Sequence, residues 1–424
     1  MSDKKYDFLD QVQEQIKAIE AKEMISHELN HHINSEKKRL VQTGVEEEEA
    51  ERVAIKQMGS PVQLGQRLNK LHRPKTDWWL ISLLVVTIGL SFLPLMFWNL
   101  DLNYYFERKI IFSVISVMII TGLMFFDYRK LYKWRWFFYL MGLFVLALLV
   151  LFPTTYTNGI PVLRVGPFGI DSTQTLLLFY VGFSALFISS KVSYWKFLLL
   201  CSVPIFFFLI VLDPNSIFVF SAMTVVLLWF SDVRKKRILL LAVSSLAVMF
   251  SAGYLLWGNL DDYQKDRILG YLNPTEYADS SGYMYLQAKE LLKAAGWFGQ
   301  RGEQVFIPTG HTDFVFLSLT YHFGWMLGII LFLVLAMLMT RMIYVTFKIN
   351  DSFGKMLVVG GLSLFSVQFL YSIAMTLGLL PIIGISLPFI SYGLTPTIMN
   401  SIVFGNVLSV YRRKNIVFKQ SITR

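Results

Sequence analysis

The residue with the clearest chemical potential is an aspartate that stands where a polar segment meets an apolar one. Asp313 follows Phe306-Ile-Pro-Thr-Gly-His-Thr and precedes a long apolar run. A carboxylate entering an apolar span is costly, and partial burial raises its proton affinity, which suits a general base. The same position also fits a helix N-cap. Both interpretations stay open, and the roles can be divided, with Thr312 capping the helix and Asp313 free.

Basic residues precede this aspartate within the same polar segment. They are Lys265, Arg267, Lys289 and Lys293. Ammonium and guanidinium groups bind phosphate oxygens strongly. These cations are therefore suited to hold the phosphates of a substrate, although any one of them alone is better explained as a solvated loop charge.

A second motif has the spacing of a zinc site. His27 and His31 enclose Glu28 in the pattern H-E-x-x-H, in which two imidazoles on one helix face bind zinc and the glutamate serves as base. No third ligand is convincing, and a short helical segment has little room for a substrate cleft. We interpret the motif as the solvated face of a polar helix and predict no metal site there.

The composition places these residues in a membrane protein. Of the 424 residues, 54% are hydrophobic and 16% are charged, whereas a soluble domain carries about 25% charged residues. The net charge of +10 comes from Lys and Arg in short loops between apolar runs, so it indicates orientation in a membrane and not nucleic-acid binding. The single cysteine, Cys201, excludes an internal disulfide framework.

Apolar stretches that approach the roughly 20 residues of a membrane-spanning helix recur along the chain. They cover residues 78–98, 110–126, 136–153, 173–190, 195–212, 216–231, 238–257, 314–340, 355–376 and 394–411. The sequence therefore predicts an all-α polytopic membrane protein with about ten transmembrane helices. These follow a small helical domain over residues 1–77, which we expect to be cytoplasmic.

Loop charges predict the orientation of the spans. An even number of spans puts both termini on one side, and the loops on that side are rich in Lys and Arg. These basic residues are Arg129, Lys130, Lys133, Arg135, Lys191, Lys196, Arg234, Lys235, Lys236, Arg237, Arg341, Lys348, Lys355, Arg412, Arg413 and Lys414. By the positive-inside rule both termini are cytoplasmic, including the tail 416–424.

The N-terminal domain reads as helix throughout. Phe8, Val12, Ile16 and Ile19 recur at helical spacing, and a second helix continues past Ile33 to a stop near Gly44. A third helix, Glu46 to Met58, ends at Gly59, and Ser60-Pro61 then starts a fourth by N-cap and N1 preferences.

One predicted external loop, residues 258–313, is long enough to be functional or disordered. It contains an amphipathic stretch from Tyr283 to Ala295, which predicts a helix near the membrane interface. Asp313 ends this loop and faces outward, where cytoplasmic nucleotide-sugars and ATP are absent. No P-loop or Rossmann glycine pattern occurs in the chain, so a lipid diphosphate is the natural activated substrate.

Two blocks of sequence carry a family pattern. The first runs from Tyr263-Gln-Lys-Asp-Arg through Gly296-Trp-Phe-Gly to His311-Thr-Asp-Phe, and the second runs from Gly378-Leu-Leu-Pro to Ser391-Tyr-Gly. Over about residues 78–415 their order and spacing resemble the SEDS family, the FtsW/RodA/SpoVE group of shape, elongation, division and sporulation proteins. Residues 5–73 resemble the helical prefix domain found ahead of some bacterial permeases, which implies a signalling or docking module.

The SEDS resemblance implies a peptidoglycan glycosyltransferase that polymerises lipid II at the outer membrane face. Asp313 matches the essential aspartate of the family, which would deprotonate the acceptor sugar hydroxyl. That hydroxyl then attacks the anomeric carbon of the donor, undecaprenyl diphosphate leaves, and an inverted β-1,4 link forms. The residues implied in substrate binding are Arg267, Gln287, Lys289, His311, Thr312, Ser391 and Tyr392.

The resemblance also implies partners and a location. Proteins of this family typically work with a class B penicillin-binding protein, a transpeptidase that crosslinks the new strand. A divalent cation, magnesium or manganese, would assist the leaving diphosphate, although no metal motif is visible. The location implied is the bacterial cytoplasmic membrane, with membrane lipids as neighbours and no nucleic acid.

Several positions differ from the family pattern and leave two alternatives open. Gln174 and Leu177 stand about where an intramembrane Glu and Lys are expected, and Pro-Asp-x-Gly reads Pro214-Asn-Ser-Ile. Such replacements favour a non-catalytic scaffold that holds a transpeptidase or lipid II under control of the N-terminal domain. A transporter of the lipid-linked precursor is the other alternative, against which the scarcity of intramembrane charges argues.

Overall fold

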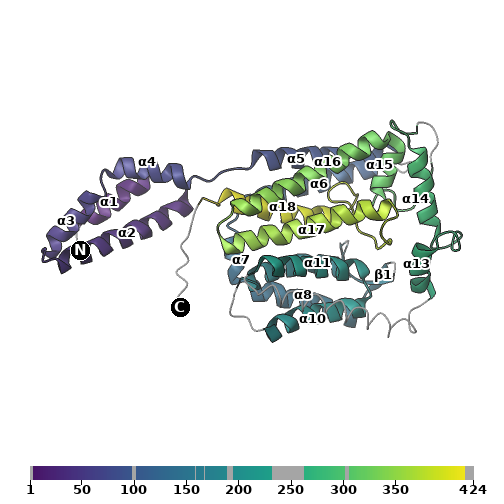
Figure 1. Ribbon diagram of the computed structural model, residues 1–424, viewed down its shortest axis with the longest axis horizontal. Coiled ribbons are helices and arrows are strands. Elements are labelled where there is room, and N and C mark those ends of the chain that lie inside the picture. Colours follow the sequence, from purple (N-terminus) through teal and green to yellow (C-terminus); the bar gives the residue numbers. More distant parts are fainter. Residues whose placement is uncertain are drawn as a thin grey trace. The chain divides into compact units, whose positions relative to one another are not determined.

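The protein is described from a computed structural model, which defines residues 3–97, 102–157, 159–166, 168–188, 194–231, 262–300 and 305–415. Its contacts divide the chain into two compact units (Figure 1). The head unit comprises Met1–Asp77 and the end of the chain from Tyr411, and the membrane unit comprises Trp78–Val410.

The head unit is built from the helices α1 Asp3–Glu14, α2 Ile19–Gln42, α3 Glu47–Gln57 and α4 Pro61–His72. They confirm the helices predicted from apolar spacing, with one exception. The pattern from Phe8 to Ile19 predicted a continuous helix, but the chain breaks between α1 and α2. Ile16 lies in that break and is still only 1% exposed, so an apolar spacing that resembles a helix arises here from burial in the head core.

Close packing in the head depends on a glycine. A Cβ atom at Gly65 on α4 would lie 2.7 Å from Cβ of Gln15 and 2.8 Å from the carbonyl oxygen of Val12. Pro61 takes the N1 position of α4 as predicted, whereas the side chain of Ser60 makes no capping hydrogen bond. The fixed φ of proline, and not the serine hydroxyl, therefore favours the start of this helix.

The H-E-x-x-H segment lies on the outer face of α2. His27, Glu28 and His31 are exposed, while Leu29 between them packs into the head core. Among the residues that the structure describes, no group of three His, Cys, Asp or Glu side chains could hold a metal ion.

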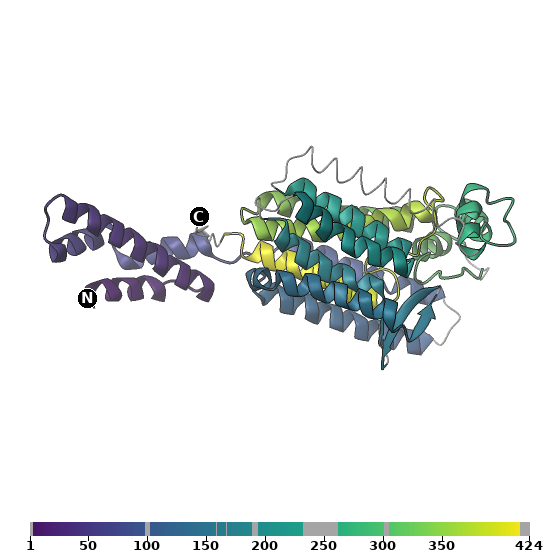
Figure 2. The same cartoon turned by 90° about the horizontal axis from the view of Figure 1, so that it is seen from below.

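The membrane unit is a bundle of apolar helices that run side by side (Figures 1 and 2). Its main members are α5 Trp78–Leu90, α6 Leu102–Phe125, α8 Arg135–Leu151, α9 Ser172–Leu186, α10 Tyr194–Val211, α11 Pro214–Phe230, α16 Trp325–Lys348, α17 Ser352–Thr376 and α18 Leu394–Arg412. These positions confirm the all-α polytopic fold. The predicted span 238–257, the basic cluster at 234–237 and the tail 416–424 lie outside the described residues.

Four of the described helical stretches are long and apolar enough to cross a membrane by themselves. They are Trp78–Phe97, Asn103–Phe125, Trp325–Lys348 and Ser352–Thr376. The first of them combines α5 with a 3₁₀ turn at Leu93–Phe97. Shorter apolar helices, α8 to α11, pack among them, and a cluster of phenylalanines from α9, α10 and α11 fills the space between these three helices.

The predicted span 314–340 is wrong as a single helix. The structure has a short helix, α15 Val315–Phe323, then Gly324 with φ +86°, then α16. Glycine adopts this left-handed conformation without the steric cost that a side chain would add. The chain therefore changes direction at Gly324 although the sequence on both sides is apolar.

The segment that follows α14 binds at this break through its backbone. The amide of Trp325 donates to the carbonyl oxygen of Gly296 at 3.0 Å, and the amide of Met326 donates to Trp297 at 3.2 Å. A Cβ atom at Gly324 would lie 2.2 Å from the carbonyl oxygen of Trp297, and one at Gly299 would lie 2.1 Å from that of His322. The two glycines thus allow the segment after α14 to touch the main chain at the start of α16.

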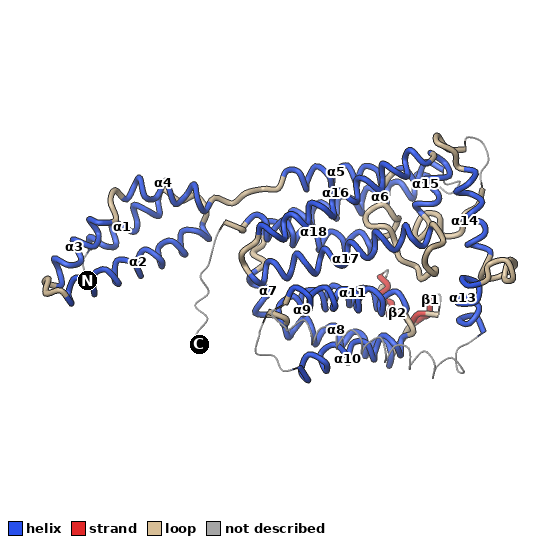
Figure 3. The backbone as a smooth tube through the Cα atoms, in the orientation of Figure 1, coloured by secondary structure: helices blue, strands red, loops and turns tan. Residues whose placement is uncertain are grey.

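A small antiparallel sheet follows α8, in the stretch between the predicted spans 136–153 and 173–190. Strands β1 Thr155–Thr157, β2 Ile160–Val165 and β3 Phe168–Ile170 are joined in the order β1-β2-β3, with Thr155 opposite Val162 and Leu163 opposite Ile170. Figure 3 shows these strands at the same end of the bundle as α13 Asp262–Leu272 and α14 Tyr283–Ala294. Helix α14 confirms the helix predicted from the amphipathic pattern at 283–295.

Two carboxylates cap the starts of helices near this sheet. Asp171 and Gln174 form a capping box at the start of α9. Asp213 caps α11 by accepting from the amide of Asn215 at 3.1 Å, and it also accepts from Ser172 Oγ at 2.6 Å. One carboxylate, only 2% exposed, therefore ties the start of α9 to the start of α11.

We expect Asp213→Ala to lower the stability of the membrane unit by about 1–3 kcal/mol, because a helix cap and a buried charged hydrogen bond are lost together. Asp213→Asn keeps an oxygen acceptor and should cost less. Thermal unfolding of the intact protein in detergent measures the difference. Asp279→Ala, at an exposed carboxylate, is the matched control, and equal midpoints for the two alanine variants would contradict the role given to Asp213.

Candidate active site

The segment that carries Asp313 is a compact turn ahead of α15. Thr309 has the left-handed φ of +52°, and its carbonyl oxygen accepts from the amides of Thr312 at 2.9 Å and Phe314 at 3.2 Å. The N-cap position of α15 is Phe314, which makes no side-chain cap bond, and the hydroxyl of Thr312 donates to Thr309. Of the alternatives that the sequence left open, the structure therefore supports neither Thr312 nor Asp313 as the cap of this helix.

The carboxylate of Asp313 is instead directed at the loop that follows α17. Oδ1 accepts from Ser386 Oγ at 3.4 Å, and Oδ2 lies 3.6 Å from the position that a Cβ atom would take at Gly384. Burial raises the pKa of this carboxyl above its ordinary value, while the Ser386 hydroxyl and the positive charge of Arg267 act in the opposite direction. The net result is a half-buried carboxylate with raised proton affinity beside a cation.

Arg267 approaches from α13, far from Asp313 in sequence. Its guanidinium donates to the carbonyl oxygen of Ile382 at 3.4 Å, and the amide of Ile382 donates to the hydroxyl of Tyr285 on α14 at 2.9 Å. Tyr271, also on α13, donates to the carbonyl oxygen of Leu379 at 2.9 Å. These contacts bring the first part of the post-α17 loop against α13 and α14.

The second part of the same loop is joined to the residues just before Asp313. Ser391 Oγ donates to the carbonyl oxygen of Thr312 at 2.6 Å and accepts from the amide of Leu387 at 2.8 Å. The amide of Tyr392 donates to the carbonyl oxygen of His311 at 2.7 Å. The structure therefore brings together four residues that the sequence placed in two distant blocks: His311, Thr312, Ser391 and Tyr392.

The ionisation of His311 limits what it can do. Burial lowers the pKa of its imidazole to about 4, because the charged ring loses more hydration than the neutral one. The ring is therefore neutral at physiological pH and offers a hydrogen bond, not a positive charge, to a phosphate.

The two remaining predicted residues lie on α14. Gln287 donates to the carbonyl oxygen of Phe306 at 3.0 Å and so holds the start of the segment that leads to Asp313, while its Oε1 is buried and has no hydrogen-bond partner among the described residues. Lys289 is exposed. The described contacts do not join Lys289 to Asp313 or to Arg267.

A divalent cation fits this arrangement poorly as a protein-bound group. Magnesium and manganese prefer several oxygen ligands, usually from more than one carboxylate or from bound phosphate. Asp313 is the carboxylate of the described site, and no cluster of three metal-binding side chains occurs in the ranges that the structure defines. We therefore assign no step of the chemistry to a metal held by this chain.

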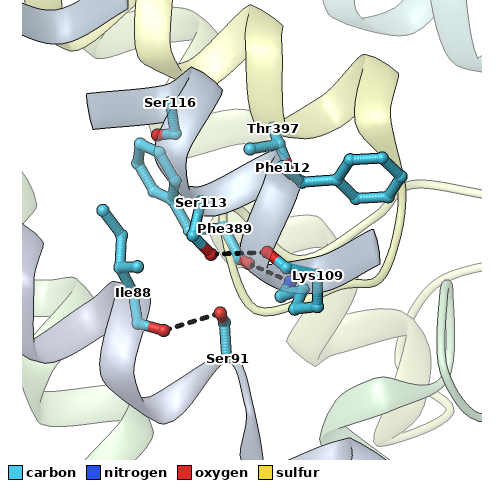
Figure 4. A pocket seen from close by; sticks show the side chains of 8 residues that line it. All are labelled: Ile88, Ser91, Lys109, Phe112, Ser113, Ser116, Phe389 and Thr397. Atoms are coloured by element: carbon cyan, nitrogen blue, oxygen red, sulfur yellow. Dashed lines mark hydrogen bonds between the residues drawn. The ribbon is translucent and has the colours of Figure 1, made fainter. Parts of the chain in front are cut away.

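Lys109 is the site residue that sequence reasoning missed. It lies in α6, is 2% exposed, and donates to the carbonyl oxygen of Phe389 at 3.2 Å (Figure 4). It also donates to the carbonyl oxygen of Ser391 at 3.3 Å. The sequence did contain a signal for Lys109, because a lysine beside an apolar run is a functional candidate. The predicted span began at residue 110, which made Lys109 look like an ordinary flanking charge.

Comparison with known proteins agrees with this architecture. The family model for the FtsW/RodA/SpoVE group, described as cell cycle protein, matches residues 75–416. Stage V sporulation protein E of Bacillus subtilis is 28% identical over 362 residues, which cover 78% of this chain and 95% of that protein. The peptidoglycan glycosyltransferase MrdB of Escherichia coli K12 is 29% identical over 206 residues, covering 43% of this chain and 55% of that one.

Solved structures show the same fold. A chain of a peptidoglycan synthase complex superimposes with a TM-score of 0.69 at 21% identity, covering 80% of this chain and 98% of its own length. RodA of Thermus thermophilus gives a TM-score of 0.60 at 19% identity, with 80% and 97% covered. Since the family model spans most of the chain, this multi-pass protein of the bacterial cytoplasmic membrane belongs to the FtsW/RodA/SpoVE family.

Proposed function

We propose that this chain is a peptidoglycan glycosyltransferase that polymerises lipid II into glycan strands at the outer face of the cytoplasmic membrane. The observation that carries the proposal is Asp313, a half-buried carboxylate whose pKa is raised by burial while the charge of Arg267 partly opposes that rise. It lies where the sequence blocks around residues 263–314 and 378–393 meet. Relatives named peptidoglycan glycosyltransferase, among them a probable FtsW of Geobacter metallireducens that is 27% identical over 328 residues, support the reaction class.

Asp313 would act as the general base. Its carboxylate takes the proton of the acceptor sugar hydroxyl while that oxygen forms a bond to the anomeric carbon of the donor. The bond from the anomeric carbon to the diphosphate oxygen breaks, and the leaving undecaprenyl diphosphate keeps the electron pair, so the centre inverts to a β-1,4 link. A raised pKa makes the ionised carboxylate a stronger base.

The surrounding residues divide into substrate contacts and positioning groups. Arg267 is the cation beside the base and is suited to the diphosphate, and the exposed Lys289 offers a second positive charge to a substrate arriving from outside. His311, Gln287 and Tyr392 would contribute uncharged hydrogen bonds to the substrate. Thr312 and Ser391 use their polar groups within the protein, which favours positioning of Asp313 over contact with the sugar.

Orientation and partners belong to the same proposal. The end of the bundle that carries the sheet, α13 and α14 is external, and the opposite end, which bears the basic helix α7 Arg129–Lys133, is cytoplasmic (Figure 1). Both termini and the head unit then lie in the cytoplasm. A class B penicillin-binding protein is the expected partner, which is consistent with a solved relative being part of a peptidoglycan synthase complex.

A non-catalytic scaffold is the second candidate, and one observation favours it. Two carboxylates at the external ends of α9 and α11, the half-buried Asp171 and the buried Asp213, are both used as helix caps, and Gln174 completes a capping box. The polar groups in this region thus stabilise the fold, and the scaffold hypothesis holds that the protein acts only by binding a transpeptidase or lipid II.

Asp313→Ala should abolish polymer formation from purified lipid II in the presence of the partner transpeptidase, since loss of a general base costs about 10²–10⁴-fold. Glycan chains are separated by length on a gel. Asp279→Ala, an exposed carboxylate of the same external segment, should polymerise as the wild type does. A folded wild-type protein that makes no polymer with any partner would favour the scaffold, and movement of labelled lipid II between leaflets would indicate transport.

Asp313→Asn should raise the thermal stability at neutral pH. Burial raises the pKa of Asp313 in the folded state, so the folded protein holds the proton more tightly than the unfolded chain does. Stability is then lost as pH rises through the folded pKa, and a neutral amide avoids that loss. Melting points of the two proteins measured from acid to neutral pH should diverge as pH rises. A lower melting point for the asparagine variant would mean that the carboxylate stabilises the fold.

Ser386→Ala should move the acidic limb of the kcat/KM profile to higher pH. The Ser386 hydroxyl donates to Asp313 and lowers the pKa of its carboxyl, so its removal raises that pKa and leaves the base protonated over a wider range. Ser386→Thr keeps a hydroxyl and serves as the control. An unchanged limb in the alanine variant would show that a group other than Asp313 sets it.

A further inference from the structure

Two neighbouring basic residues at the start of α6 behave in opposite ways. Arg108 is exposed, and its guanidinium lies 4.1 Å from the ring centre of Tyr104. Lys109 is turned inward and is 2% exposed. A lysine near a helix end normally extends its ammonium group toward water. The inward orientation of Lys109 therefore needs a reason within the protein.

The partners of Lys109 are main-chain carbonyl oxygens of one tight turn. The ammonium donates to Phe389 at 3.2 Å and to Ser391 at 3.3 Å, and Figure 4 shows it directed at the carbonyl of Phe389. Phe389 has a φ of +60°, a left-handed conformation that is strained for a residue with a side chain. A cation shared by two carbonyls stabilises a backbone that would otherwise be unfavourable.

The same turn is bonded to the residues immediately before Asp313. Ser391 donates through Oγ to Thr312 at 2.6 Å, and the amide of Tyr392 donates to His311 at 2.7 Å. Lys109, the turn and the segment at 311–313 therefore form one continuous set of hydrogen bonds. A change in the turn would be passed to the backbone that presents the carboxylate.

Lys109 is poorly placed to touch a substrate. The cavity beside it is lined by α5 and α6 residues and by Phe389 and Thr397, and its volume is about 10 Å³ (Figure 4). A space of this size holds about one water molecule. Neither a sugar nor a diphosphate group fits there.

We propose that Lys109 is a positioning residue for Asp313, acting from inside the membrane helix α6 through the turn at 389–391. The proposal rests on the proposed function of Asp313 as the base. Lys109 acts on the rate of the chemical step through the backbone geometry of residues 311–313, without binding the substrate.

The test compares Lys109→Met, Lys109→Arg and Ser116→Ala in the full-length protein. Methionine keeps a long unbranched side chain but removes the donors, and arginine keeps the charge and the donors. Ser116 lines the same cavity from the same helix, but its hydroxyl pairs with Ser401 and not with the turn. It is therefore the matched control for a change in the cavity wall.

The first readout is amide hydrogen exchange. In Lys109→Met the amides of Ser391, Tyr392, Thr312 and Phe314 should exchange faster than in the wild type, and Lys109→Arg and Ser116→Ala should leave them slow. The second readout is polymerisation of lipid II. Lys109→Met should lower kcat on the order of 10–100-fold with KM unchanged, because small displacements of a catalytic group have large effects. Lys109→Arg should restore kcat to within a few-fold.

The outcomes separate this proposal from the function on which it rests. Unchanged exchange at residues 311–314 in Lys109→Met overturns it, as does altered exchange with an unchanged kcat. A raised KM with an unchanged kcat in Lys109→Met would mean that Lys109 contacts the substrate, which also overturns the proposal. If the wild type makes no polymer, the proposed function fails, and the exchange data alone then decide whether Lys109 holds the two segments together.

Discussion

The fold depends on one constraint, which is that main-chain polar groups at the edge of a membrane must find partners within the protein. Residues 377–393, between α17 and α18, form no regular helix, so local hydrogen bonds such as that from the amide of Ser391 to Leu387 satisfy only part of their amides and carbonyls. Partners come from three distant places. Tyr271, Arg267 and Tyr285 supply them from α13 and α14, His311 from the turn before α15, and Lys109 from α6.

The candidate site is a consequence of this arrangement. Some of the groups that satisfy the irregular loop also lie close to Asp313, so structural and chemical roles overlap: Arg267 acts on the carboxyl through its charge, and His311 precedes Asp313 by two residues. Ser391 illustrates the overlap: it is 1% exposed and uses its hydroxyl to join two backbone segments. The sequence at 378–393 that matches the family pattern can therefore be explained by the shape that this loop must adopt. The shape of the loop in turn sets the position of the Asp313 carboxylate.

The sequence predicted the helices well because a lipid environment demands long apolar runs and the head shows clear apolar spacing. Asp313 was also predictable, since a carboxylate at the edge of an apolar run is unusual by itself. The break at Gly324, the sheet at 155–170 and the role of Lys109 were not, because each depends on contacts between segments far apart in the chain. Local patterns indicate which residues form elements, but not which backbone groups remain to be satisfied between them.

The close approach of Gly299 and Gly324 has a mechanical consequence. With no side chain at either position, the main chain after α14 is fastened directly to the first turn of α16 by the amides of Trp325 and Met326. The start of α16 and the segment after α14, which leads toward Asp313, are therefore coupled through their main chains. A displacement of the start of α16 would therefore reach the segment after α14 directly through these main-chain hydrogen bonds.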